Sequence, residues 1–137
     1  MRRMFFVLAA TACVMVVACD DNNQLAPSEI VGGSWELKSI QTGSAAPVVI
    51  TTPSRYTAQF NDDGRVAVKS DCNQCGGSYS LNGSNLTIGP LACTKVFCGD
   101  TSLDSQFSGA LDGTASASVD GNELVIRSGD VTLRFEE

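Results

Sequence analysis

Four cysteines in the second half of the chain carry its most distinctive chemistry. Cys72, Cys75, Cys93 and Cys98 have the spacing C-x2-C-x17-C-x4-C. Thiolates at such a spacing can bind a structural zinc ion, and a Cys-x-x-Cys pair supports thiol–disulfide exchange when a helix N-terminus lowers the pKa of a thiol. In an oxidising compartment the same residues form disulfides instead. The choice depends on the compartment, which the N-terminus indicates.

The N-terminal segment is typical of an exported bacterial lipoprotein. Arg2 and Arg3 precede an uncharged apolar run over residues 4–18, which is short for a membrane span and ends in small residues, as a secretory signal does. The run closes on V-V-A-C, which resembles the lipobox of bacterial lipoproteins. The alternative is an ordinary signal peptide, or an uncleaved anchor, with a coincidental cysteine. We predict cleavage before Cys19, acylation of Cys19, and a membrane-anchored protein of the bacterial cell envelope that faces the periplasm or the exterior.

An exported location favours disulfides over zinc binding or redox activity. Two glycines follow the first cysteine pair, so the helix that a redox motif needs is missing. A hairpin turn expected at residues 82–85 gives cross-strand partners whose numbers sum to about 167. This register places Cys75 opposite residues 92–93 and leaves Cys98 for Cys72. We therefore expect two nested disulfides, Cys72–Cys98 and Cys75–Cys93.

The other polar residues form no recognisable catalytic set. The chain has no histidine, which removes the usual base of serine and cysteine hydrolases and the commonest transition-metal ligand. Lys69 and Ser70 are neighbours on an expected strand, so their side chains point to opposite faces. Asp62 and Asp63 lie in an expected turn without the spacing of a calcium loop. We predict no catalytic residues, no bound metal and no cofactor, and a protein that is not an enzyme.

The segments that must position the cysteines show apolar and polar residues mainly with the two-residue period of β-strands. Apolar and polar residues alternate over residues 35–40, 56–60, 65–69, 78–81, 86–88 and 131–135, residues 124–126 are a short apolar run, and turn sequences separate most of these segments. Residues 100–111 instead carry an apolar stripe with helical spacing. Thr101 and Asp104 approximate a capping box at its start. We predict a mainly β (α+β) fold, an antiparallel meander curled into a small barrel with one covering α-helix.

The chain divides into a signal peptide, a tether and one domain. Residues 1–18 are the expected signal peptide, residues 19–33 a polar, lipid-anchored tether with no helical or strand period, and residues 34–137 one domain. Without Arg2 and Arg3, seven basic residues face 15 acidic ones, a net charge of −8. Such a surface repels nucleic acid and anionic lipid headgroups. We expect a monomer that reaches the membrane through its lipid and does not bind nucleic acid.

The ordered motifs of this domain resemble the META/HslJ domain family. The matching features are W-E-L at residue 35, G-R-V at residue 64, the Cys72–Asn73 step, G-S-Y at residue 77, L-T-I at residue 86, Thr94 before Cys98, the helix, and the closing L-V-I and L-R-F strands. Cys72 and Cys98 fall on the two cysteines usual in the family, whereas Asp71 replaces its usual glycine. The resemblance implies a β-barrel-like sheet with a helix and no established enzymatic activity.

These observations favour a lipid-anchored binding or envelope-maintenance module without catalytic activity. An inhibitor of an exported hydrolase, of the protease or lysozyme type, is the alternative, because small disulfide-stapled proteins suit that role. The expected contact surface for an envelope protein partner is Lys95, Val96 and Phe97, between two bridged cysteines, with the helix start at residues 100–102. The competing expectation, which the usual burial of phenylalanine favours, is that Phe97 plugs the barrel beneath the helix.

Overall fold

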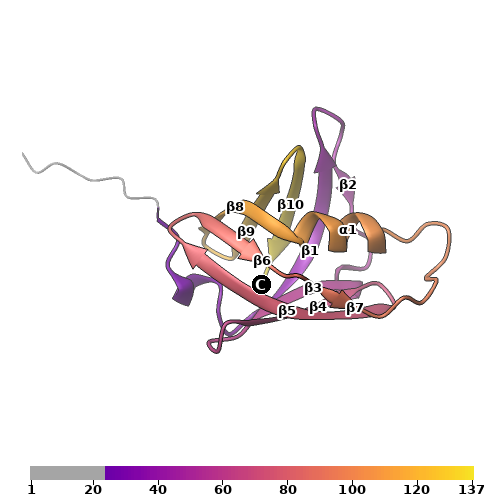
Figure 1. Ribbon diagram of the computed structural model, residues 1–137. Coiled ribbons are helices and arrows are strands. Elements are labelled where there is room, and N and C mark those ends of the chain that lie inside the picture. The colour runs from indigo at the N-terminus through magenta and orange to yellow at the C-terminus, as the bar shows by residue number, and fades with distance from the viewer. Residues whose placement is uncertain (1–23) are drawn as a thin grey trace, which may run out of the picture.

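Alternating apolar and polar residues build most strands of this protein, as in β4, where Val66 and Val68 are buried and Arg65 and Ala67 are exposed. The computed structural model describes residues 24–137, so the predicted signal peptide and Cys19 lie outside it (Figure 1). The barrel strands are β1 (Ser34–Thr42), β3 (Tyr56–Phe60), β4 (Arg65–Ser70), β5 (Asn73–Asn82), β6 (Asn85–Ile88), β8 (Gly113–Asp120), β9 (Glu123–Ser128) and β10 (Val131–Glu136).

The strands close into a ring. Each barrel strand pairs antiparallel with the next, in the order β1, β3, β4, β5, β6, β8, β9, β10, and β10 pairs with β1 to complete the circle. At this seam Leu37 faces Phe135 and Ile40 faces Leu133, and all of these side chains are buried. The predicted fold class, a mainly β antiparallel meander curled into a barrel with one helix, is confirmed.

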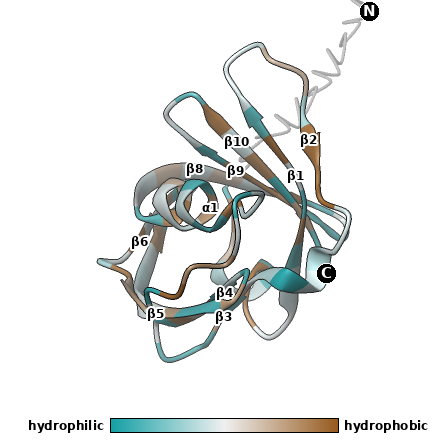
Figure 2. Cartoon of the chain, turned by 90° about the vertical axis from the view of Figure 1, so that its right-hand side faces the viewer, coloured by the Kyte–Doolittle hydropathy of each residue, from teal (hydrophilic) through white to brown (hydrophobic). Residues whose placement is uncertain are grey.

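One end of the barrel is covered by α1 (Asp104–Leu111), which Figure 2 shows within the ring of strands. The helix buries Phe107, Ala110 and Leu111. The ring of Phe107 meets Tyr56 edge-to-face at 5.6 Å and lies 6.1 Å from Phe135. The helix therefore closes the core at this end, as the sequence predicted.

Two short strands lie beside the barrel at the same end. β2 (Val48–Val49) pairs with β1, and β7 (Ala92–Cys93) pairs with β5. A 3-10 turn, η2 (Pro53–Arg55), leads into β3. Neither β2 nor β7 was predicted, because a strand of two residues is too short to show a period.

The helix is shorter than the predicted span of residues 100–111, and the predicted capping box is absent. α1 begins at Asp104 without a side-chain cap on the Leu103 N-cap position. The backbone N–H of Asp104 donates to Ser102 Oγ at 3.2 Å, and Ser102 N–H donates to Gly99 O at 3.2 Å. Residues 99–103 thus form a turn whose hydrogen bonds replace the first helical turn.

The prediction that residues 19–33 form a tether is partly wrong, because the second half of this segment belongs to the folded domain. Leu25 and Ile30 are buried in the core, and η1 (Pro27–Glu29) lies between them. Trp35 Nε1 donates to Ile30 O at 2.9 Å, and Val31 forms a parallel bridge with Phe60. The folded unit therefore begins near Leu25 and not at Ser34.

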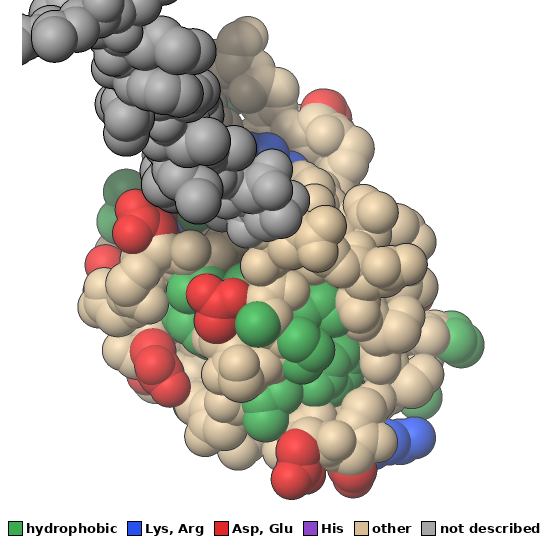
Figure 3. Space-filling model, turned by 90° about the vertical axis from the view of Figure 1, so that its left-hand side faces the viewer, with side chains coloured by type: hydrophobic (Ala, Val, Ile, Leu, Met, Phe, Trp, Pro, Cys, Tyr) green, Lys and Arg blue, Asp and Glu red, His purple; other side chains and the backbone are tan. Residues whose placement is uncertain are grey.

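The N-terminal side of the domain lies away from the helix. Gln24 packs beside Gly83, in the turn between β5 and β6, and Figure 1 shows this turn at the opposite side from α1 and β7. On that face, hydrophobic side chains gather near the centre, with acidic side chains to the left of them and below them (Figure 3). No helix within residues 24–137 is long and apolar enough to span a bilayer.

Candidate functional site

Two disulfides hold residues 92–99, here called the clamped loop, against the barrel. Cys75 and Cys93 bridge adjacent positions of β5 and β7 with a Cα–Cα distance of 4.0 Å. Cys72 and Cys98 bridge the start of β5 to the far end of the loop with a Cα–Cα distance of 5.6 Å. Both bridges have the partners expected from the sequence, and with all four sulfurs joined no thiolate is left to bind zinc or to exchange.

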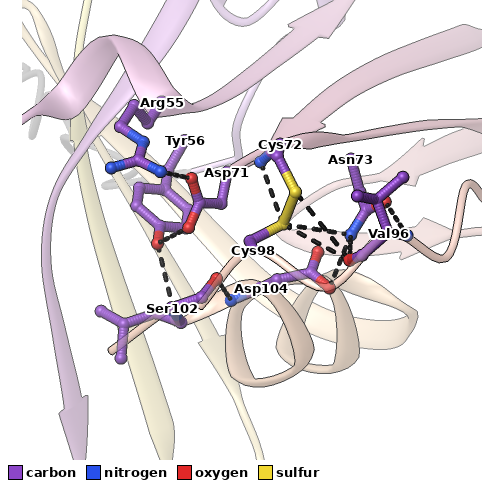
Figure 4. A network of polar contacts seen from close by, with 10 residues as sticks. Arg55, Tyr56, Asp71, Cys72, Asn73, Val96, Cys98, Ser102 and Asp104 are labelled. Carbon is purple, nitrogen blue, oxygen red and sulfur yellow. Dashed lines mark hydrogen bonds and ion pairs between the residues drawn. A yellow bond between two sulfur atoms is a disulfide. The ribbon is translucent and has the colours of Figure 1, made fainter. Parts of the chain in front are cut away.

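A buried asparagine holds the middle of the clamped loop (Figure 4). The Asn73 side chain, 1% exposed, accepts a hydrogen bond from Val96 N–H at 2.8 Å and donates Nδ2 to Val96 O at 3.0 Å. Thr94 Oγ1 also donates to Asn73 Oδ1 at 2.8 Å. Asn73 Nδ2 lies 3.0 Å from Asp104 Oδ2 at the start of α1. One side chain thereby joins β5, the loop and the helix.

A second polar network lies at the other side of Cys72. Asp71 is buried, has a φ of 59°, and forms an ion pair with Arg55. Tyr56 Oη donates to Asp71 Oδ2 at 3.2 Å and accepts from Leu103 N–H at 3.1 Å. The network therefore ties the turn before α1 to the strands beneath it, as Figure 4 shows.

The pKa of Asp71 is lowered by its surroundings. Burial alone raises that pKa, but hydrogen bonding from Ser102, the positive charge of Arg55 and the hydroxyl of Tyr56 together lower it by more. The carboxylate is therefore held ionised and engaged. Its burial and its contacts with Arg55 and Tyr56 give it a structural role in fixing the turn.

The left-handed backbone at Asp71 explains why an aspartate can replace the glycine that the family resemblance implies at this position. A φ of 59° is adopted readily by glycine, the usual family residue, and among other residues mainly by asparagine and aspartate. Aspartate keeps the turn and adds the ion pair with Arg55.

The clamped loop presents exposed hydrophobic side chains. Phe97 is 79% exposed and Val96 is 59% exposed. The expectation that Phe97 plugs the barrel is wrong, because Phe107 of α1 already fills that space and is fully buried. Within residues 24–137, the other large hydrophobic side chains that are exposed are Val48 and Val49 of β2.

Two grooves border the clamped loop. The larger, about 510 Å³, lies between the loop and α1, and its walls include Lys95, Phe97, Ser105, Gly109 and Asp112. The smaller, about 300 Å³, lies between β2 and residues 98–103. The exposed valines and Phe97 therefore lie along hollowed surface, which suits contact with another molecule.

The structure places the residues that the sequence singled out for binding along two different grooves that border the clamped loop. Lys95, Val96 and Phe97 lie on the clamped loop, and Thr101 lines the smaller groove beside Cys98. Sequence reasoning did not identify Asn73 as the residue that holds the loop. Its only signal was the Cys72–Asn73 step within the family resemblance.

Comparisons with known proteins add a family and a fold. Residues 28–137 match the family model described as the META domain. A protein from Burkholderia xenovorans solved by NMR has 16% identity, with 99% of this chain and 97% of that chain covered and a TM-score of 0.65.

Other solved structures agree on the fold. Another NMR structure has 22% identity, covers 82% of this chain and 94% of its own, and has a TM-score of 0.63. The crystal structure of a lipocalin-like protein from Bacteroides uniformis has 18% identity, 80% and 98% coverage and a TM-score of 0.53. No curated protein matches the chain. At these identities the solved structures share the fold with this chain.

Proposed function

Since this chain belongs to the META domain family, we propose that it is a non-catalytic binding protein of the bacterial cell envelope, anchored by a lipid on Cys19. Its clamped loop contacts an envelope protein. The observation that carries the proposal is the exposure of Phe97, at 79%, on a loop held by two disulfides and Asn73. An exposed aromatic on a preordered loop gains contact area at little entropic cost.

The positions of Gln24 and of the clamped loop on opposite sides of the barrel support this arrangement. Gln24 lies beside the β5–β6 turn, at the opposite side of the barrel from α1 and the clamped loop (Figure 1). A chain anchored upstream of Gln24 holds the domain by that side. The clamped loop then faces away from the membrane that carries the lipid, so its partner is a protein and not the anchoring bilayer.

Site-specific photo-cross-linking in producing cells tests the binding role. A benzoylphenylalanine in place of Phe97 should give a discrete cross-linked product with an envelope protein. The matched control replaces Asn82, exposed in the β5–β6 turn, and should not give that product. Absence of a product at position 97, or the same product from both positions, would contradict the proposal.

A separate experiment tests the anchor. Cys19→Ala should abolish incorporation of labelled fatty acid and release the protein from membranes or leave its precursor uncleaved. Cys13→Ala, within the predicted signal peptide, is the control and should be labelled as the wild type is. Equal labelling of the Cys19 variant would refute lipidation at this residue.

A hydrolase inhibitor is a second candidate function, favoured by the rigidity of the clamped loop. Inhibitory loops bind active-site clefts because they are held extended and exposed. Here the disulfides and the Asn73–Val96 pair hold Lys95, Val96 and Phe97 in that manner. Dose-dependent inhibition of an exported protease or lysozyme that Phe97→Ala abolishes would support this role. No inhibition across a panel of such enzymes would exclude it for the panel.

A further inference from the structure

The clamped loop has an open backbone edge along the larger groove. Thr94 N–H donates to Gln74 O at 3.0 Å, and Val96 pairs with the Asn73 side chain. Backbone groups alternate in direction along an extended segment, so those of Lys95 and Phe97 should face away from β5. Both residues line the groove beside α1. Among residues 24–137, no hydrogen bond uses the backbone N–H or C=O of Lys95 or Phe97.

The opposite wall of the groove leaves room for a chain. The helix side consists of Asp104, Ser105, Ser108, Gly109 and Asp112. A Cβ built on Gly109 would meet nothing within 4 Å. A groove with an unpaired strand edge on one wall and a helix with small side chains on the other suits addition of an extended peptide as a further strand.

The charges of the helix wall indicate what that peptide carries. Asp104 and Asp112 lie eight positions apart in sequence, about 12 Å along the axis at 1.5 Å per residue. An extended peptide covers that distance in about four residues, and side chains four apart lie on the same face. Lys95 stands on the loop wall, so the two carboxylates give the groove a net negative charge.

We propose that this groove binds an extended segment of the partner protein by β-strand addition, with basic side chains at positions i and i+4 facing Asp104 and Asp112. The inference rests on the proposed binding function and names its ligand. The partner's backbone pairs with the open edge at Lys95 and Phe97. Affinity then depends on both the peptide backbone and the two basic side chains.

Binding of short peptides to the full-length chain, purified in mild detergent, tests this assignment. The probe is a fluorescent, acetylated and amidated pentapeptide K-V-T-V-K, measured by anisotropy. Its counterpart E-V-T-V-E should bind at least tenfold more weakly. Methylating single backbone nitrogens along the probe should weaken binding at least tenfold at alternate positions and less than twofold between them, the pattern of a paired strand. Equal affinity for both peptides, or a uniform effect of methylation, would overturn the proposal.

Gly109 provides a matched pair of variants. Gly109→Phe fills the groove and should weaken probe binding at least tenfold. Gly109→Ala adds a methyl group in open space and should bind within twofold of the wild type. Both variants should retain the wild-type Tm or exceed it, because glycine is a poor helix former. Unchanged binding by Gly109→Phe would overturn the site.

Charge exchange tests the role of Asp112. Asp112→Lys should weaken binding of the lysine probe and strengthen binding of the glutamate peptide. No exchange of preference would refute the pairing of basic side chains with this wall. A protein that dimerises and loses its dimer when the probe binds would assign the groove to a second copy and overturn the peptide proposal.

The failure of this inference and that of the proposed function give different results. If Gly109→Phe abolishes probe binding but a photoreactive residue at position 97 still captures the same envelope protein, the binding function stands and the groove is not the partner's site. If position 97 captures nothing while the probe still binds as described, the groove is a peptide site and the proposed envelope partner is wrong.

Discussion

Asn73 and Val96, 23 positions apart, are joined through both polar atoms of the asparagine amide. Val96 N–H donates to Oδ1 at 2.8 Å, and Nδ2 donates to Val96 O at 3.0 Å. A buried side chain thus takes the place of a neighbouring strand. The loop is held extended on one side, and its other side remains open.

Replacing Asn73 by aspartate tests this relationship. Asn73→Asp removes the donor to Val96 O and places a carboxylate beside that of Asp104, so we expect a loss of about 2–3 kcal/mol at neutral pH. The neighbouring negative charge raises the folded-state pKa of the new carboxyl, so its penalty should grow as pH rises above about 4. Chemical unfolding at low and neutral pH measures the effect. Asn82→Asp, exposed in a turn, is the control, and an equal loss in both variants would contradict the assignment.

Phe97→Ala and Phe107→Ala should have opposite consequences. Phe97 is 79% exposed, whereas Phe107 is fully buried. We expect Phe97→Ala to change the free energy of unfolding by less than about 0.5 kcal/mol and to abolish capture of the partner. Phe107→Ala should cost about 3–5 kcal/mol. Thermal unfolding of both variants measures these effects. A drop of several degrees in the Tm of Phe97→Ala would mean that the Phe97 side chain packs in the fold.

Each disulfide should stabilise the domain, but only one should hold the tip of the clamped loop. The bridges close segments of 26 and 18 residues, which in the chain-entropy model contributes about 3 kcal/mol each. Replacing Cys72 and Cys98 by serine should also raise amide hydrogen exchange across residues 96–99. Replacing Cys75 and Cys93 should change exchange there less, because the β5–β7 pairing and Asn73 remain. Equal exchange in the two double variants would contradict this division.

Asp71 should contribute to acid sensitivity. The pKa of Asp71 is lowered in the folded state. The ionised carboxylate therefore stabilises the fold at pH values above its unfolded-state pKa, and this contribution is lost as pH falls below about 4. Asp71→Asn keeps the left-handed turn and removes the ion pair with Arg55. The variant should have a Tm several degrees below wild type at neutral pH, and the gap should narrow toward pH 3 in thermal unfolding. Parallel pH profiles would refute this role, and Asp62→Asn, exposed in the β3–β4 turn, is the control.

The barrel was predictable from the sequence because its turns and alternating strands are local signals. Trp35 and Leu37 alternate with polar neighbours, and Gly64, with a φ of 78°, completes the turn after β3 as expected. The start of β5 was missed because Asn73 and two glycines interrupt the apolar period. The role of Asn73 depends on which loop residue lies opposite it, which is a long-range fact.

Isolated apolar residues were misjudged for a related reason. Leu25 and Ile30 lie in a segment with no helical or strand period to mark them, yet both are buried in the core. Phe97 was expected in the core because phenylalanine is usually buried. The space beneath the helix is filled by Phe107, whose ring packs against Tyr56 and Phe135. Which of the two phenylalanines, Phe97 or Phe107, fills this space depends on the assembled structure and not on the residue type.

The seam between β1 and β10 has a consequence for how the chain acquires its structure. Its pairs join residues near positions 36–42 to residues 131–136, so the first barrel strand keeps one exposed edge until the last has been synthesised. During that interval the unpaired edge of β1 can pair with other chains. Such non-local pairing also slows folding. Because the last six residues include most of β10, their loss should prevent closure of the barrel and expose the protein to proteases and chaperones.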